Sequence, residues 1–109
     1  MPIARNQVRF AKPLPHPGTI LSMDYMEPLG LTPYSLAQRM HVARQRIERL
    51  SRGEQALTAD TALRLARVFT NTSPAFWMNL QTAHELSSAE IMKRDELNEI
   101  EALEMSEAS

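Results

Sequence analysis

The sequence predicts an all-α fold, a five-helix orthogonal bundle, from three observations. Apolar residues recur at helical spacing in several stretches, whereas no stretch alternates apolar and polar residues at the period of a strand. Prolines and small polar residues stand where helices are expected to begin, and no hairpin turn occurs. The 109 residues suit one domain, and the absence of cysteine excludes disulfides and thiolate metal sites.

Proline positions delimit the first two predicted helices. The first covers residues 19–26, and Pro28 should end it, because a proline disfavours helical geometry in the residue before it. The second begins at Pro33, with Thr32 as its N-cap, and extends to about residue 40. Its expected core positions are Leu36, Ala37 and Met40.

A turn at residues 41–43 separates this helix from a third short helix, expected from residue 43 to residue 51. Gly53 provides a natural stop just beyond it. Two short helices joined by such a turn are the sequence form of a helix-turn-helix. In that motif the second helix enters the major groove of DNA.

The fourth and fifth helices complete the predicted bundle. The fourth is expected from Thr58 to about Phe69, and the fifth from Pro74 to about Leu86, with Ser73 as its cap. The expected core positions of the fourth helix are Ala62, Leu63, Leu65, Ala66 and Phe69. Those of the fifth are drawn from Phe76, Trp77, Leu80, Ala83 and Leu86.

The chain is expected to have three parts: a flexible N-terminal arm at residues 1–16, a folded domain at residues 17–86, and an acidic tail at residues 87–109, partly helical or disordered. Residues 1–84 hold ten Lys/Arg and five Asp/Glu, a net charge of +5, whereas residues 85–109 hold two and eight, a net charge of −6. The total of −1 therefore conceals a basic body and an acidic tail. Such asymmetry indicates charged partners.

One face of the third predicted helix carries the residues expected to contact DNA bases. At about 100° per residue, Ile47 and Leu50 point into the bundle, while Gln45 and Arg49 lie on the opposite face with Arg44 at its edge. Arginine can pair with the O6 and N7 atoms of guanine, and glutamine with the N6 and N7 atoms of adenine. These three side chains are therefore the predicted base contacts.

Phosphate contacts are expected from residues around this face. They fix the register of a protein on DNA without carrying sequence information. The predicted phosphate contacts are Tyr34, Ser35, Arg46 and Arg52. The alternative is that the arginines merely solvate an exposed helix, but the turn length, the short second helix and Gly53 favour DNA binding.

No catalytic or metal site is indicated. His16, His41 and His84 are scattered without metal-ligand spacing, and the three glycines lie too far apart for a phosphate-binding loop. No run approaches the roughly 20 apolar residues of a membrane span, and the N-terminus lacks the apolar core of a signal peptide. We expect a cytoplasmic protein that is not an enzyme, holds no cofactor and does not bind a membrane.

The motifs resemble a known family. Residues 31–53 resemble the XRE/Cro-type, lambda-repressor-like helix-turn-helix. More narrowly, four strings resemble the HigA-type antitoxins: HPG at 16–18, EPLGL at 27–31, LTADTALRLA at 57–66 and SPAFWMNLQ at 73–81. The resemblance covers about residues 16–86 and leaves out the first fifteen residues and the tail.

The resemblance implies a bacterial antitoxin that neutralises a HigB-type toxin, a ribosome-dependent endoribonuclease that cleaves mRNA. It also implies a dimer that represses its own operon at a palindromic operator. Arg44, Gln45 and Arg49 fall where related repressors place base-contacting side chains. Pro33 departs from the pattern, which often has a phosphate-contacting glutamine there. The phosphate contacts at the start of this helix are therefore expected from Tyr34 and Ser35 instead.

The resemblance also bears on the fifth predicted helix, because the last helix of this family commonly pairs subunits. Phe76, Trp77 and Leu80 are therefore candidates for a dimer interface, although aromatic residues at a helix start more often belong to the core. For the toxin, the basic arm and the tail from Glu90 to Glu107 are the candidate surfaces. An acidic tail would attract a cationic ribonuclease, and its alternative is a merely solvated end.

Two other functions stay open. One is a stand-alone helix-turn-helix transcriptional regulator without a toxin partner, which the absence of a small basic ribonuclease gene next to its own would indicate. The other is a protein-interaction module whose helix-turn-helix no longer binds DNA, for which Glu48 and Pro33 are the only support.

Overall fold

The computed structural model describes residues 10–105, and every regular element within this range is a helix, as predicted. The outer parts of the predicted arm and tail, residues 1–9 and 106–109, lie outside the described residues. None of the described helices is long and apolar enough to cross a membrane. In chain order the elements are α1 (Pro17–Ile20), η2 (Leu21–Met26), α2 (Glu27–Leu29), α3 (Pro33–Met40), α4 (Arg44–Ser51), α5 (Ala59–Val68), α6 (Pro74–Met92) and α7 (Arg94–Asn98).

The first three elements follow one another without a break and act as one helix from Pro17 to Leu29. The prediction that Pro28 ends this helix was wrong, since the helical geometry continues to Leu29 and stops at Gly30, which has a φ of 65°. The reason lies in η2, a π-helical segment in which each N–H reaches five residues back. Its wider turn accommodates a proline, which has no N–H to donate and needs room for its ring.

The helix-turn-helix has the predicted boundaries because its ends are set by local chemistry. The Thr32 hydroxyl accepts a bond from the Ser35 N–H at 3.1 Å, and the Ser35 hydroxyl accepts one from the Thr32 N–H at 2.9 Å. This reciprocal capping box begins α3. The turn bends at His41, whose φ is 60°, and Gly53, with a φ of 75°, follows the end of α4.

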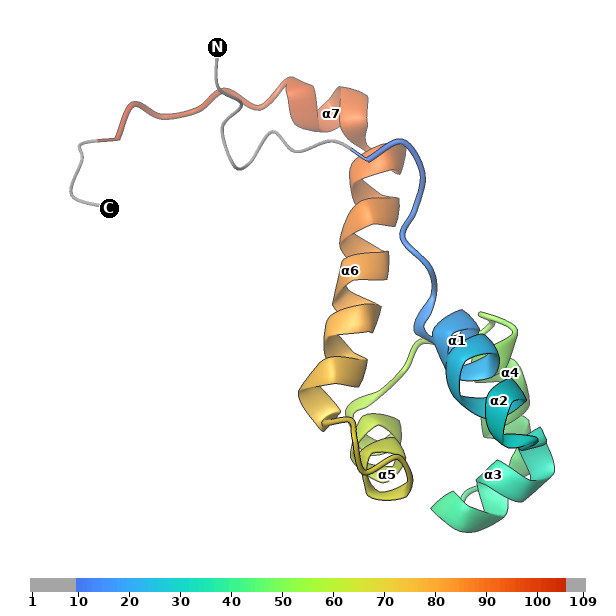
Figure 1. Ribbon diagram of the computed structural model, residues 1–109. Helices are drawn as coiled ribbons and strands as arrows, with labels where there is room; N and C mark the ends of the chain where they lie inside the picture. Colours follow the sequence, from blue (N-terminus) through green and yellow to red (C-terminus); the bar gives the residue numbers. More distant parts are fainter. Residues whose placement is uncertain (1–9, 106–109) are drawn as a thin grey trace.

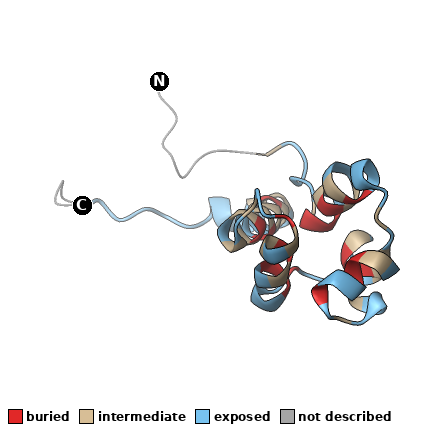
Figure 2. Cartoon of the chain, turned by 60° about the horizontal axis from the view of Figure 1, so that its bottom comes forward, coloured by how far each residue is buried: buried red, intermediate tan, exposed pale blue. Residues whose placement is uncertain are grey.

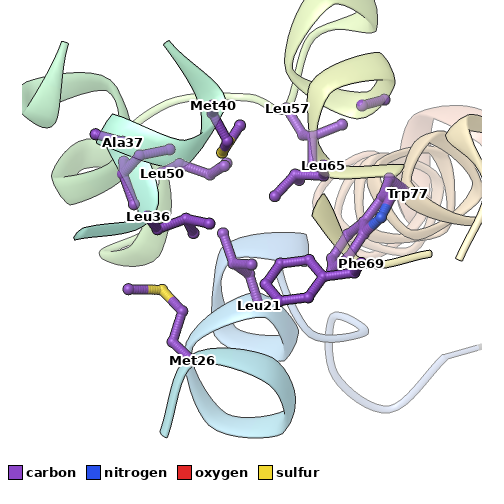
Figure 3. Close-up of a cluster of buried hydrophobic side chains, with 12 residues drawn as sticks. Leu21, Met26, Leu36, Ala37, Met40, Leu50, Leu57, Leu65, Phe69 and Trp77 are labelled. Carbon is purple, nitrogen blue, oxygen red and sulfur yellow. The ribbon is translucent and has the colours of Figure 1, made fainter. Parts of the chain in front are cut away.

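The core lies where the first helix, α3, α4, α5 and α6 converge. Figure 1 shows α6 on one side of the molecule, the first helix with α3 and α4 on the other, and α5 below. Figure 2 shows that the buried residues line the inner faces of these helices while their outer faces are exposed. In Figure 3, Leu21 of η2 lies between the side chains of α3 and α4 and the aromatic rings of Phe69 and Trp77.

Trp77 is the largest fully buried side chain. Its indole N–H donates to the Thr72 hydroxyl at 2.9 Å, so the one polar atom of the ring is satisfied inside the core. Tyr25 and Phe76 pack against it with ring centroids 5.0 and 5.1 Å away. Because the ring is enclosed within its own protomer, the alternative placement of Trp77 in a dimer interface does not fit.

One predicted core residue of α5 and one candidate core residue of α6 are on the surface. Leu63 of α5 is 56 % exposed and Leu86 of α6 is 63 % exposed. Two polar side chains of the same helices are buried instead: Thr61 on α5, and Ser87 on α6, which is completely buried. Helical spacing alone does not show which residue at the edge of an apolar helix face is buried. The elements packed against each helix determine this.

Ser87 is buried because the chain before α1 lies along α6, which runs six residues further than predicted. The Ser87 hydroxyl accepts a bond from the Leu14 N–H at 2.8 Å, and the His84 Nδ1 atom donates to the Leu14 carbonyl at 2.7 Å. Beyond the end of α6, the guanidinium of Arg94, the first residue of α7, donates to the Phe10 carbonyl at 2.7 Å. Within the segment expected to belong to a flexible arm, Leu14 is thus bonded to α6 and Phe10 to α7.

Gly18 sets the distance between the first helix and α4. A Cβ atom at this position would lie 1.7 Å from the Leu50 carbonyl oxygen, an overlap that only a backbone shift could relieve. We therefore expect Gly18→Ala to destabilise the fold by about 3 kcal/mol or more, the upper end of overpacking costs. Urea unfolding followed by circular dichroism measures this change.

Gly30→Ala is the matched control, because a Cβ atom at Gly30 meets nothing within 4 Å and the cost comes only from its left-handed backbone. We expect this control to lose about 1–2 kcal/mol. Equal losses in the two variants would show that the contact with Leu50 does not constrain the packing.

Candidate nucleic-acid interface

The outward face of α4 carries the three predicted base-contacting residues. Arg44, Gln45 and Arg49 are exposed, whereas Ile47 and Leu50 on the opposite side are buried. This orientation confirms the helical-wheel prediction, while the role of the three side chains at DNA stays a prediction. Among the described residues, Gln45 and Arg49 form no side-chain hydrogen bond or ion pair, so their donors are free for a ligand.

Arg44 differs, because its guanidinium lies 3.6 Å from the Glu48 carboxylate one turn further along α4. An acid on a DNA-facing surface repels phosphates unless it orients a cation or accepts from cytosine. The observed pair fits the first of these roles. Glu48 therefore restricts the conformations of Arg44 and does not argue against DNA binding.

A groove of about 560 Å³ runs between α4 and the start of α5. Its walls are formed by Ala43, Gln45, Arg46, Arg49, Leu50, Gln55, Ala56, Thr58, Asp60 and Thr61. Sequence reasoning missed Gln55 and Asp60 as members of this surface. The missing information is the path of residues 52–58, which folds the chain back beside α4 and which no short-range pattern specifies.

The structure gives the predicted phosphate-contacting residues very different environments. Tyr34 is 57 % exposed and its hydroxyl accepts a bond from the Gln38 amide at 3.0 Å. Ser35 uses its hydroxyl in the capping box, both accepting from and donating to the backbone of Thr32. Arg52 is exposed at the end of α4 and lies 3.8 Å from Glu54. Tyr34 and Arg52 therefore offer more to a phosphate than Ser35 does.

Arg46 is bound to α5. Its guanidinium donates to the Asp60 carboxylate at 2.5 Å, and Asp60 also accepts a bond from Arg64 at 3.0 Å. Arg64 in turn donates to the carbonyl of Met40 at 2.8 Å, at the end of α3. The hydrogen bonds from Arg46 and Arg64 lower the pKa of Asp60, so this carboxyl is ionised at neutral pH. The three charged side chains thus connect α5 to both helices of the helix-turn-helix.

His16 precedes the first helix and interacts with the backbone of Gln55, a residue of the groove wall. Its Nδ1 atom accepts a bond from the Gly18 N–H at 2.9 Å and so caps the first helix, while the ring also bonds to the backbone of Gln55. The ring of His84 lies 5.0 Å away, centroid to centroid, in an edge-on arrangement. Burial, and then the proximity of His84, lower the pKa of His16.

No group of three or more His, Cys, Asp or Glu side chains within residues 10–105 is placed to hold a metal ion. Of the candidate dimer residues, Phe76 and Leu80 are half-buried at the edge of the core.

The chain matches known proteins along most of its length. The family model described as helix-turn-helix matches residues 23–77. Virulence-associated protein I of Dichelobacter nodosus is 41 % identical over 90 residues, which are 83 % of this chain and 79 % of that protein. An uncharacterized HTH-type transcriptional regulator of Escherichia coli (strain K12) is 40 % identical over 89 residues, 80 % of this chain and 78 % of that protein.

Among solved structures, the chain is similar to the Pseudomonas aeruginosa antitoxin HigA with the higBA promoter. The TM-score is 0.79 at 34 % sequence identity, over 84 % of this chain and 99 % of that chain. Because 84 % of this chain is covered, the similarity extends well beyond the two helices of the helix-turn-helix.

The lowered pKa of His16 predicts a pH-dependent stability. Below the ordinary histidine pKa of about 6.5, the unfolded chain binds a proton at this position more readily than the folded protein does. Stability is therefore complete above that pH and falls as the pH drops through the lowered pKa. Protonation of Nδ1 also removes the acceptor that caps the first helix.

His16→Asn tests this prediction, because asparagine can cap a helix but does not titrate. Between about pH 7 and pH 5, the thermal unfolding midpoint should fall less in this variant than in the wild type. His41→Asn, at an exposed turn position, should retain the wild-type dependence. A His16→Asn protein with an unchanged pH profile would contradict the assignment.

Proposed function

Since the chain belongs to the helix-turn-helix family, among the relatives of the HigA antitoxins, we propose that it is the antitoxin of a type II toxin–antitoxin system. In this proposal it represses its own operon through sequence-specific DNA binding and neutralises a HigB-like, mRNA-cleaving toxin. The observation that carries the DNA-binding part is the exposed face of α4, where Gln45 and Arg49 have unoccupied donors beside an open groove.

In the proposed mechanism α4 enters the major groove and presents its outer face to the base edges. Arg49 and Arg44 pair with guanine and Gln45 with adenine, each through two hydrogen bonds. Tyr34 at the start of α3 and Arg52 just after α4 both have exposed side chains. Their contacts to phosphates would fix the register of α4 along the DNA.

A homodimer would match the two halves of a palindromic operator. The two copies of α4 would then lie about one DNA turn apart, roughly 34 Å. Phe76 and Leu80 are half-buried on α6 and keep apolar surface that a second copy could cover, whereas Trp77 does not. We therefore place the dimer contact on α6, around Phe76 and Leu80.

The toxin would bind at the other end of α6. There the chain combines exposed apolar side chains with a high density of acids, the composition that suits a cationic ribonuclease with an apolar patch. Met92 is 83 % exposed, Ile100 71 % and Leu103 83 %. The acids around them are Asp95, Glu96, Glu99, Glu101 and Glu104.

A stand-alone transcriptional regulator is the second candidate, and the regulator from Escherichia coli with 40 % identity favours it. This function would use the same α4 face and the same operator contacts but no toxin. A small basic ribonuclease encoded beside the gene distinguishes the two candidates in favour of the antitoxin.

Arg49→Ala tests the base-contacting role. Because a bidentate contact to a base contributes about 1–3 kcal/mol of discrimination, binding to the DNA upstream of the gene should weaken by that amount and lose preference at one base pair. Binding to scrambled DNA should weaken much less. Fluorescence anisotropy across a salt series measures both.

Arg67→Ala is the matched control, since Arg67 is an exposed arginine on α5 outside the groove. It should bind the upstream DNA as the wild type does. Equal weakening of Arg49→Ala on upstream and scrambled DNA would mean that Arg49 contacts phosphate rather than a base.

Neutralising the tail tests the toxin site. A variant with Asp95→Asn, Glu96→Gln and Glu99→Gln should bind the neighbouring-gene ribonuclease about tenfold more weakly at low salt, because charge complementarity governs such encounters. Its operator affinity should not fall. Isothermal titration calorimetry with the purified ribonuclease gives the affinity.

The control carries Asp24→Asn and Glu27→Gln, which remove acids from the first helix instead. Unchanged toxin binding by the tail variant, or equal weakening by the control, would exclude the tail as the toxin site while leaving the DNA-binding proposal intact.

A further inference from the structure

Asp60 brings a carboxylate into the groove beside the proposed base-contacting residues. It is the second residue of α5, and it shares the groove wall with Gln45 and Arg49. Its side chain is 52 % exposed. Since DNA phosphates repel a carboxylate, an acid at this position opposes binding unless a neighbouring cation neutralises it.

Two arginines bind Asp60, but only one of them can leave it easily. Arg64 donates through Nε to Asp60 at 3.0 Å and through Nη1 to the Met40 carbonyl at 2.8 Å, so it is held from two sides. Within the described residues, Arg46 is bonded through its side chain to Asp60 alone, at 2.5 Å. Arg46 is therefore the cation that a phosphate could draw away.

The ion pair between Arg46 and Asp60 is weak enough for Arg46 to exchange Asp60 for a DNA phosphate. The side chain of Arg46 is 40 % exposed, so water and salt screen its attraction to Asp60. Exposed ion pairs of this kind add little to folding stability. Asp60 is charged at neutral pH, as an aspartate with an ordinary or a lowered pKa is, and it therefore competes with DNA phosphates for Arg46 under ordinary conditions.

The competition affects the two modes of DNA binding unequally. Binding to random DNA depends on phosphate contacts, to which long basic side chains adjust freely. Binding to an operator depends on base contacts that fix the register, and Gln45 and Arg49 have no bond to Asp60. An acid that retains Arg46 therefore weakens random binding more than operator binding.

We propose that Asp60 is a specificity-determining residue: it holds Arg46 on α5, away from the phosphates, and so suppresses binding to DNA of random sequence. The inference rests on the proposed DNA-binding function. A basic side chain in such a groove strengthens binding to any DNA, whereas Asp60 would weaken binding to random DNA. It also revises the sequence-based expectation for Arg46, which becomes a phosphate contact only when Asp60 releases it.

Asp60→Asn tests the proposal, because asparagine keeps the size of the side chain and removes its charge. Anisotropy titrations with upstream and scrambled DNA, each across a salt series, compare the variant with the wild type. We expect binding to scrambled DNA to tighten about three- to fivefold and its salt slope to steepen by about one unit, as one more arginine reaches a phosphate. The ratio of operator to random affinity should fall by a similar factor.

Two controls isolate the mechanism. Asp24→Asn removes the same charge from η2, outside the groove, and should leave the ratio within about twofold of wild type. Asp60→Asn combined with Arg46→Ala should lose the steeper salt slope, because Arg46 supplies the new contact. Asp60→Glu should restore the wild-type ratio, and circular dichroism verifies that each variant is folded.

The outcomes separate this inference from the proposed function. If the wild type shows no preference for upstream DNA, even with the neighbouring gene product present, the proposed repressor function fails. If the wild type is selective but Asp60→Asn has an unchanged ratio, or the double variant keeps the steeper slope, the role of Asp60 is overturned while the repressor stands.

Discussion

The close approach of Gly18 to the Leu50 carbonyl is the constraint on which the rest of the structure depends. It allows the first helix to press its backbone against α4, so that Leu21 reaches the core between α4 and the aromatic rings. Ile47 and Leu50 are buried on the inner side of α4, so only the opposite face of this helix can point outward. The orientation of the candidate DNA-binding surface therefore depends on Gly18 of the first helix, which has no side chain to hold α4 away.

Polar links then hold α4 in the position that packing has set. His16 caps the first helix and bonds to the loop that lines the groove, while Arg64 bonds to the end of α3 and Asp60 bonds to Arg46 on α4. Each link is weak alone because it lies near the surface. Together they join the elements around α4 and leave the side-chain donors of Gln45 and Arg49 unbonded. A preorganised recognition surface requires both a rigid support and free donors.

The features that the sequence predicted correctly are determined by interactions between residues close together in the chain. Thr32 and Gly53 bound the helix-turn-helix by capping and by a left-handed turn, both of which are local. The errors at Pro28 and Leu63, and the omission of Asp60, have longer-range causes. A π-helical segment before Pro28 lets the helix continue through the proline. On α5, the packing of the surrounding helices buries Thr61 and leaves Leu63 exposed. Asp60 contacts Arg46 only because residues 52–58 fold the chain back beside α4.

The length of α6 explains how a chain with a net charge of −1 can keep the basic face of α4 apart from most of its acids. The acids are concentrated at its far end, in and beyond α7, while α5 lies at its beginning (Figure 1). A helix of 19 residues spans about 28 Å, more than three times the screening length of about 8 Å at physiological salt. The tail's charge is therefore screened from the groove, whereas the carboxylate of Asp60 lies in the groove wall, where we propose that it affects DNA binding.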